Sequence, residues 1–328
     1  MLISVDKAVE LLQHAEAVAV PTETVYGLAA VATNAKAISR IFEIKNRPAD
    51  NPLICHFCDI EQIKTFATSI PENTLRLLQH FSPGPISFML DLPQDSSLLF
   101  ATCGNPQMIA RIPDHPLFLS IIKKLNVPVA APSANTSGRI SATTAEMVEK
   151  DLGDKISGIV DGGATAVGLE STIVDARSME KVFVLRPGLI GEKEIKSVLR
   201  DVKVIFDQDD SGKNIPGAKY PHYAPKTPVK ILTSVVDIID HPDSAVFLTL
   251  ESMQTIPRSI FPILTSKNIH LLEIGTLQDL NSIARNFYQV VSSVDQLELS
   301  QAYFLMTDFG DSSLGKTLQN RLQKIVTG

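Results

Sequence analysis

The sequence predicts an α/β protein with a larger domain at residues 1–205, a linker at 206–228 and a smaller domain at 229–328. Apolar runs of strand length alternate with segments of helical periodicity in both domains. The alternation stops in the linker, which is rich in Asp, Gly and Pro. The 328 residues are enough for two domains, and the 44% of hydrophobic residues can fill a sizeable core.

Local patterns justify each element of the larger domain. Ser4 is a suitable N-cap for the first helix, and Pro71 suits the start of the third. Apolar residues recur at helical spacing in six segments, where we expect helices: 4–15, 34–47, 71–81, 115–126, 143–152 and 191–202. Short apolar and β-branched runs predict strands at 17–22, 52–57, 85–92, 107–113, 127–134, 156–161, 171–176 and 181–187. The order of these strands in the sheet does not follow from their sequences.

The smaller domain repeats this alternation over about 100 residues, a common domain size. Strands are expected at 229–234, 245–250 and 302–309, and helices at 277–291 and 314–326. The pattern predicts a second, smaller α/β unit.

Composition argues against several classes of protein. The formal net charge of −6 does not suit a protein that depends on contacts with nucleic-acid phosphates, so no stable nucleic-acid binding is expected. No apolar run reaches the roughly 18 residues of a membrane span, and the N-terminal residues lack the basic region of a signal peptide. Three cysteines are few and odd in number, which suits a reducing compartment. We expect a cytoplasmic protein.

Two of the cysteines, Cys55 and Cys58, form a CxxC pair that could indicate a redox or metal site. A redox pair opens a helix, whereas this pair follows a predicted strand whose alternation points the two thiols to opposite faces. A zinc site would have to draw its remaining two ligands from Cys103 and His56. The sequence therefore predicts no metal site.

Seven polar clusters stand at the ends of predicted elements in the larger domain, where loops build sites. They are PTETVYG at 21–27, KNRPADNPL at 45–53, SPGP at 82–85, RIPDHP at 111–116, PSANTSGRISATT at 132–144, GLESTIVD at 168–175 and LRPG at 185–188. They contain the cations Lys45, Arg47, Arg111, Arg139 and Arg186, together with many hydroxyls and the amides Asn51 and Asn135. Each arginine alone could form a surface ion pair, but together they predict a phosphate-bearing ligand.

No motif in the larger domain indicates a covalent protein intermediate. It has no GxSxG, HExxH or GxGxxG sequence, and no serine, cysteine or histidine stands in an evident triad. An enzyme of this kind would hold two reactants together and stabilise charge, as in phosphoryl and nucleotidyl transfer. For the first cluster, PTETVYG, an alternative to a role in the site stays open, in which Thr22 and Thr24 bond only to the backbone of their own turn.

The smaller domain contains GDSSLGKT at 310–317, which matches the GxxxxGK[ST] pattern of a phosphate-binding loop. It follows a predicted strand and opens a helix, as such a loop should. However, no later strand can supply the acidic partner of magnesium, and Asp311 would lie inside the cradle. The alternative is a turn shaped by Gly310 and Gly315, with Lys316 in solvent.

In this order, the clusters resemble those of the Sua5/YrdC family, and the two-domain length resembles its Sua5 branch. PTETVYGL, KNRPADNPL, PSANTSG and STIVD followed by LRPG carry the resemblance over residues 1–190. KYPHYAP in the linker resembles the HYAP motif of the family, and SLGKTLQNRLQK extends the likeness into the smaller domain. SPGP and AKYPHY depart from the usual WPGP and MKYRHY.

The resemblance implies a YrdC-like twisted mixed sheet flanked by helices, and a smaller Rossmann-like α/β domain. It implies the synthesis of L-threonylcarbamoyladenylate and pyrophosphate from L-threonine, bicarbonate and ATP. The product would pass to a transfer complex that forms t6A at position 37 of tRNA. Mg²⁺ is expected to arrive with the phosphates of ATP rather than in a protein site.

The resemblance also implies which residues contact each substrate. L-Threonine would be held by Thr24, His56, Arg111, Ser133 and Ser171, with Arg111 suited to its carboxylate. ATP would face Lys45, Arg47, Asn51, Asn135, Thr143 and Arg186, with Lys45 and Arg47 in the catalytic role. Tyr223, together with His222, would close the cavity from the linker. Two other functions stay open: a non-catalytic RNA-binding module, and a nucleotidase that uses residues 310–317.

Overall fold

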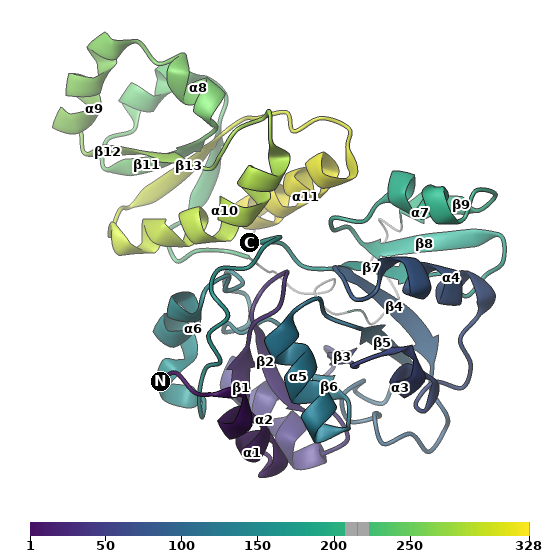
Figure 1. The fold of residues 1–328 in the computed structure, drawn as a ribbon. Helices are drawn as coiled ribbons and strands as arrows, with labels where there is room; N and C mark the ends of the chain where they lie inside the picture. Colours follow the sequence, from purple (N-terminus) through teal and green to yellow (C-terminus); the bar gives the residue numbers. More distant parts are fainter. Residues whose placement is uncertain (207–214, 216–222, 328) are drawn as a thin grey trace. The chain divides into compact units, whose positions relative to one another are not determined.

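The computed structural model describes residues 1–206, 215 and 223–327, and the chain divides into two compact units. Unit 1 comprises residues 1–137 and 141–220, and unit 2 comprises residues 138–140 and 221–328. Most of the predicted linker, including His222, lies outside the described residues. Each unit combines helices with a sheet (Figure 1), so the predicted α/β fold class is confirmed.

Nine strands of the described residues form the mixed sheet of unit 1, in the order β1-β2-β6-β3-β5-β4-β7-β8-β9. Their bounds are β1 Val18–Val20, β2 Gly27–Val31, β3 Ile54–His56, β4 Ile86–Asp91, β5 Gln107–Arg111, β6 Val129–Ala130, β7 Thr172–Asp175, β8 Lys181–Arg186 and β9 Lys203–Phe206. The pairs β3–β5, β4–β7 and β8–β9 are parallel, and the other neighbours are antiparallel.

The helices of unit 1 begin close to where their capping residues predict. Ser4 Oγ accepts a hydrogen bond from the Lys7 amide, and Thr144 Oγ1 accepts one from the Met147 amide. The helices are α1 Val5–Gln13, α2 Ala35–Lys45, α3 Ile60–Lys64, α4 Glu72–Phe81, α5 Pro116–Leu125, α6 Ala145–Leu152 and α7 Glu192–Val198. Of these, the sequence pattern does not predict the short α3.

The two faces of this sheet bury different residues, because successive side chains of a strand alternate. One face packs into the main core, together with apolar side chains of α2, α4, α6 and α7. The opposite face packs against α1 and α5 where it is formed by β1, β2 and β6. Across β3, β5, β4, β7 and β8, this second face carries a smaller apolar cluster, made of Ile54, Met89, Ile109, Ile173, Leu185 and Ile215. The polar residues described below alternate into this second face.

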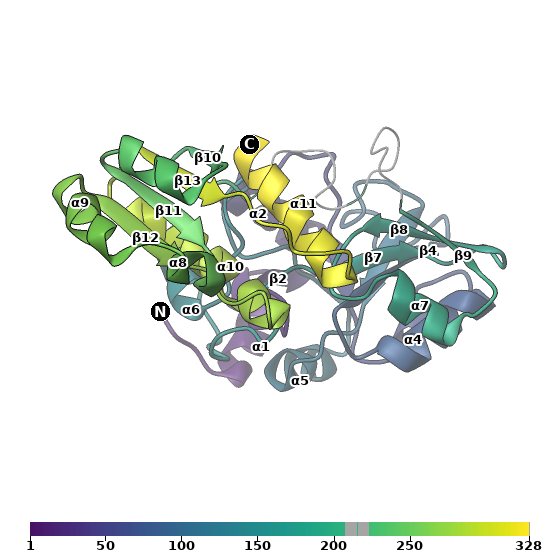
Figure 2. The same ribbon diagram turned by 90° about the horizontal axis from the view of Figure 1, so that it is seen from above.

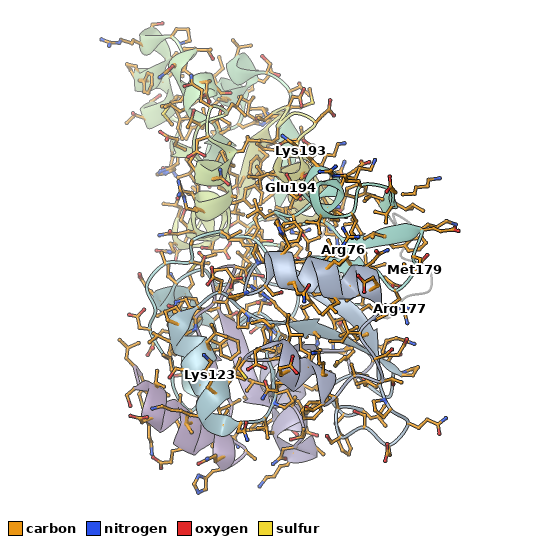
Figure 3. The ribbon with its side chains drawn as sticks, turned by 45° about the vertical axis from the view of Figure 1, so that its right-hand side comes forward. Arg76, Lys123, Arg177, Met179, Lys193 and Glu194 are labelled. Carbon is orange, nitrogen blue, oxygen red and sulfur yellow. The ribbon has the colours of Figure 1, made fainter. Side chains whose placement is uncertain are left out.

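Polar contacts fix α4 beside α7, and Figure 2 shows the two helices side by side. Arg76 Nη2 of α4 donates a hydrogen bond of 2.6 Å to the carbonyl of Val198 at the end of α7 (Figure 3). Asn73 Nδ2 donates to the carbonyls of Ser178 and Met179, both at 3.0 Å. These bonds tie α4 to α7 and to the turn before β8.

Unit 2 contains a parallel sheet of four described strands, in the order β10-β13-β11-β12. The strands are β10 Val229–Leu232, β11 Ser244–Leu248, β12 Ile269–Glu273 and β13 Gln301–Leu305, and the α-helices are α8 Leu250–Gln254, α9 Phe261–Ser266, α10 Leu280–Ser293 and α11 Ser313–Thr327. On one face, Val246 and Leu248 pack with apolar residues of α8 and α9. On the other, Phe304 lies 5.7 Å from Phe287 of α10 between ring centroids. A parallel sheet between two helical layers is Rossmann-like, as expected.

One strand prediction in unit 1 is wrong, and the sequence pattern does not predict two of the observed strands, β2 and β9. Residues 156–161 form no strand, because Ile159 alone makes isolated bridges, to Leu2 and Ala19. Conversely, Gly27–Val31 forms β2, although glycine and alanine are depleted in strands.

Among the described residues, no helix combines the length and the apolar character that a membrane span requires.

Candidate active site

A row of buried residues crosses the middle of the unit 1 sheet. The register places His56 of β3 opposite Arg111 of β5, and Ser87 of β4 opposite Ile173 of β7, which pairs with Arg186 of β8. Because Phe88 pairs with Ala110, Ser87 adjoins Arg111 in the same row. The strands thus bring together three predicted site residues that lie up to 130 positions apart in sequence, from 56 to 186.

Arg111 joins this row to the PTETVYG segment. Its Nη2 donates a hydrogen bond of 2.9 Å to Thr24 Oγ1 and lies 2.8 Å from Oε1 of Glu23. All three side chains are buried. The segment that precedes β2 therefore contributes a hydroxyl and a carboxylate beside the guanidinium.

The sequence left two roles open for these threonines, a local one in the turn and one in the site. Thr22 has the first role, and Thr24 has a contact that suits the second. Thr22 Oγ1 accepts hydrogen bonds from the amides of Thr24 and Val25 and donates one of 2.7 Å to the Val25 carbonyl. Thr22 therefore shapes the turn, as the local interpretation expects. Thr24 Oγ1 instead accepts from Arg111, so this hydroxyl belongs to the polar row.

Ser171, which directly precedes β7, connects Arg186 with Ser87. Arg186 Nη2 donates to Ser171 Oγ at 3.0 Å, and its Nε and Nη2 donate to the Ser171 carbonyl at 3.1 and 2.9 Å. The hydroxyls of Ser171 and Ser87 lie 2.8 Å apart. Ser87 is not among the predicted site residues, because its place in the row follows from the register of β4 alone.

Lys45 ends α2 and is fully buried. Its Nζ donates to the backbone carbonyl of Ser133 at 2.5 Å and to that of Asn135. Burial lowers the pKa of the Lys45 ammonium well below its ordinary value, and the charge of Arg47 acts in the same direction. Lys45 therefore orders the PSAN segment, and its catalytic role stays a prediction.

Arg47 is held by the segment that leads into β3. Its Nε donates to the Asn51 carbonyl at 2.9 Å, and its Nη2 donates to Asn51 Oδ1 and the Pro52 carbonyl, both at 2.7 Å. Burial, together with the charge of Arg186, lowers the pKa of Arg47 to about 10. Two guanidinium groups whose charges act on each other suit an anionic ligand.

His56 is a neutral member of the row. Burial lowers its pKa well below the ordinary 6.5, and the positive charge of Arg111 adds to the effect. Its ring lies 5.2 Å from that of Phe118 in α5, measured between centroids. Nδ1 is buried and finds no hydrogen-bond partner among the described residues. A neutral imidazole with an open ring nitrogen can bond to a ligand hydroxyl.

Two other predicted site residues, Thr143 and Tyr223, have contacts of a different kind. Thr143, just before α6, donates a hydrogen bond of 3.4 Å to Met147 Sδ. Tyr223 belongs to unit 2, where it stacks on Tyr288 at 5.4 Å between ring centroids, and the Arg321 guanidinium lies 5.0 Å from its ring centroid. The contacts proposed for both with ATP stay predictions.

The cysteines form no pair in the described structure, where all three thiols are free. Cys55 packs into the main core, and burial raises its pKa to about 12. Cys58 packs with the cluster of α1 and α5 on the other side of the sheet. The opposite orientation expected from strand alternation is therefore confirmed.

Three backbone amides of the P-loop-like segment of unit 2, residues 310–317, already donate hydrogen bonds to nearby residues of the chain. The amide of Gly310 donates to Asp308 Oδ1, that of Gly315 to Ser312 Oγ and that of Lys316 to the Ser312 carbonyl, at 2.8 to 3.0 Å. A phosphate cradle needs such amides to be free. The segment therefore fits the interpretation as a turn better than that as a phosphate site.

Unit 1 is an α/β module whose sheet carries buried guanidinium groups and hydroxyls on one face, an arrangement that suits a small anionic ligand. Residues 10–188 match the Sua5–YciO–YrdC family model, described as "Telomere recombination". Residues 190–325 match the model described as "Threonylcarbamoyl-AMP synthase, C-terminal domain".

Full-length relatives agree with these matches. The chain is 36% identical to a Bacillus subtilis protein named threonylcarbamoyl-AMP synthase, over 98% of this chain and 92% of that one. A protein of the same name from Pyrococcus abyssi is 34% identical, over 97% and 92%. The crystal structure of P. abyssi Sua5 complexed with L-threonine matches with a TM-score of 0.81 at 31% identity, over 98% and 94% of the two chains. The chain belongs to the Sua5/YrdC family.

Proposed function

We propose that the protein is a threonylcarbamoyl-AMP synthase that forms L-threonylcarbamoyladenylate and pyrophosphate from L-threonine, bicarbonate and ATP. The full-length relatives carry this name, and the solved P. abyssi Sua5 holds L-threonine. The single observation on which the proposal rests most is the hydrogen bond between Arg111 and Thr24, because it joins the PTETVYG segment to the buried polar row.

The row offers partners for the carboxylate and for the side-chain hydroxyl of L-threonine. The guanidinium of Arg111 suits the carboxylate, because it presents N–H donors in a planar fork. The neutral ring of His56, with its open Nδ1, suits the side-chain hydroxyl. The hydroxyls of Thr24 and Ser171 and the backbone of Ser133 complete the proposed threonine site.

The nucleotide would bind beside Arg47 and Arg186, whose charges offset those of the phosphates. Asn51 holds Arg47 in place, while Lys45 holds Asn135 and its neighbours. Mg²⁺ enters as part of the ATP substrate, since phosphate oxygens and water satisfy most of its coordination.

The reaction needs positioning and charge stabilisation rather than a protein nucleophile. The amine of threonine takes up bicarbonate, and water leaves, which gives a carbamate. An oxygen of the carbamate attacks the α-phosphate of ATP, and pyrophosphate departs. The adenylate would then pass to the tRNA threonylcarbamoyl transfer complex for t6A formation.

Mass spectrometry of the product tests the proposal. We expect incubation with ATP, Mg²⁺, L-threonine and ¹³C-bicarbonate to yield an adenylate whose mass rises by one unit relative to unlabelled bicarbonate. AMP or ADP without a threonine-containing adenylate would contradict the proposal.

A further inference from the structure

Glu23 is a buried carboxylate that the proposed roles leave unused. Its Oε1 lies 2.8 Å from Arg111 Nη2, yet neither Oε1 nor Oε2 accepts a hydrogen bond from a described residue. An ionised carboxylate can accept about four hydrogen bonds, and burying one without donors is costly. A pair that served structure alone would be expected to satisfy these oxygens, as bidentate arginine–carboxylate pairs do.

Arg111 also keeps unused hydrogen-bonding capacity. Its Nη2 is shared between Glu23 and Thr24, and its Nε is a long 3.4 Å from the Gly84 carbonyl. Nη1 makes no hydrogen bond to a described residue. Two opposite charges therefore adjoin in a buried place, and each can still bond to a ligand.

We propose that Glu23 binds the α-ammonium group of the amino-acid substrate while Arg111 binds its carboxylate. An amino acid carries both charges on one carbon, so an adjacent carboxylate and guanidinium complement it. The three N–H donors of the ammonium would satisfy the open acceptors of Glu23. This inference rests on the proposed function and adds a specificity-determining residue to the threonine site.

If Glu23 binds the ammonium, the threonine site should prefer ligands that carry an amino group over analogues that lack it. A site built to hydrogen-bond one substrate group rejects an analogue that lacks it, because the buried partner is left unpaired. The matched analogue is (R)-3-hydroxybutyrate, which is L-threonine with its amine replaced by hydrogen.

Isothermal titration calorimetry of the full-length protein with each compound tests the inference. For Glu23→Gln we expect threonine affinity to fall roughly 10- to 100-fold, the loss of hydrogen bonds to a charged group. The affinity for (R)-3-hydroxybutyrate should change by less than about threefold, since no ammonium is involved. An equal fall for both compounds, or no fall for threonine, would overturn the inference.

Two further variants keep the test decisive. Glu170→Gln alters another buried glutamate, which accepts a hydrogen bond of 2.7 Å from Ser141 Oγ, and should leave the ratio of the two affinities unchanged. Glu23→Asp keeps the charge but withdraws the carboxylate by one methylene, so if Glu23→Gln fails to fold, an unchanged ratio in Glu23→Asp would overturn the inference. If the unmodified protein neither binds threonine nor makes the adenylate, the proposed function itself fails.

Discussion

Arg111 is the residue at which the sheet of unit 1 meets the PTETVYG segment. It forms a buried ion pair with Glu23 and a hydrogen bond with Thr24. Removing one partner of a buried pair leaves an uncompensated charge, which typically costs 3–5 kcal/mol. We expect Arg111→Met to lower the free energy of unfolding by about that amount.

Urea denaturation of Arg111→Met, Glu23→Gln and the double variant checks this prediction. The double variant should lose less stability than the sum of the single variants, because it leaves no buried charge unpaired. Additive losses would show that the two side chains are not coupled.

His56 makes stability depend on pH in a defined direction. Its pKa in the folded protein lies well below 6.5, so below about pH 6.5 the unfolded chain binds a proton that the folded protein does not. Its neutral form therefore stabilises the fold above that pH, and the stability is lost as the pH falls. Between pH 7 and 5 we expect the free energy of unfolding to fall less steeply in His56→Gln, by up to about 1.4 kcal/mol per pH unit. Urea denaturation at several pH values measures both slopes, and equal slopes would contradict the assignment.

At the level of single residues, the sequence predicts which residues belong to the site better than it predicts the contacts between them. Arg111, Thr24, His56, Ser171 and Arg186 are predicted to contact the substrates, and the structure places them in or beside one buried row of the sheet. Glu23 stands in the same cluster, but nothing local shows whether its carboxylate is buried or solvated. Ser87 lies in the predicted strand 85–92, where no local pattern distinguishes it.

Among the elements, the turn after β8 depends on a glycine. A Cβ on Gly188 would lie 2.5 Å from the Thr172 amide nitrogen and 2.9 Å from the Glu170 carbonyl oxygen. Gly188→Ala must therefore shift the segment that holds Ser171 against Arg186. We expect a loss of about 1–3 kcal/mol in stability and a higher KM for threonine.

Gly153→Ala is the matched control. Its Cβ would find no atom closer than 3.5 Å, and the backbone there is right-handed helical, so stability should hold or rise slightly. Thermal unfolding and threonine-dependent kinetics compare the two variants. Equal behaviour would show that the contact of Gly188 with β7 does not matter.

Long periodic segments gave reliable predictions of elements, whereas short ones did not. The helices α1, α2, α4, α5, α6 and α7 have clear apolar faces, but the five-residue α3 does not. Strand β2 begins with glycine and contains two alanines, so packing between β1 and β6 outweighs its weak propensity. The row from His56 to Arg186 depends on pairing between distant strands, which no local pattern encodes.

For the whole molecule, the key alternative places catalysis in unit 2. Lys316 is exposed, and its amide and those of Gly310 and Gly315 already have acceptors. We expect Lys316→Ala to keep pyrophosphate release within about twofold, since a surface side chain rarely matters. Arg47→Ala should lower it at least about 100-fold, as loss of one charge-stabilising donor does. The reverse pattern, measured by steady-state kinetics, would place the chemistry in unit 2.

The division of the chain into an α/β unit with the polar row and a smaller parallel-sheet unit follows the change in composition around the linker. The amino-acid sequence does not indicate that residues 138–140 group with unit 2, where Arg139 forms an isolated β-bridge with Ala224. That assignment depends on contacts between segments about 85 residues apart, beyond the reach of a local pattern.

Synthase activity is best tested by measuring pyrophosphate release from ATP and Mg²⁺, with and without L-threonine and bicarbonate. We expect release that requires both threonine and bicarbonate, because the carbamate formed from them is the attacking group. Release that proceeds equally without threonine would contradict it and indicate a nucleotidase. No release under any of these conditions would contradict synthesis by this protein alone.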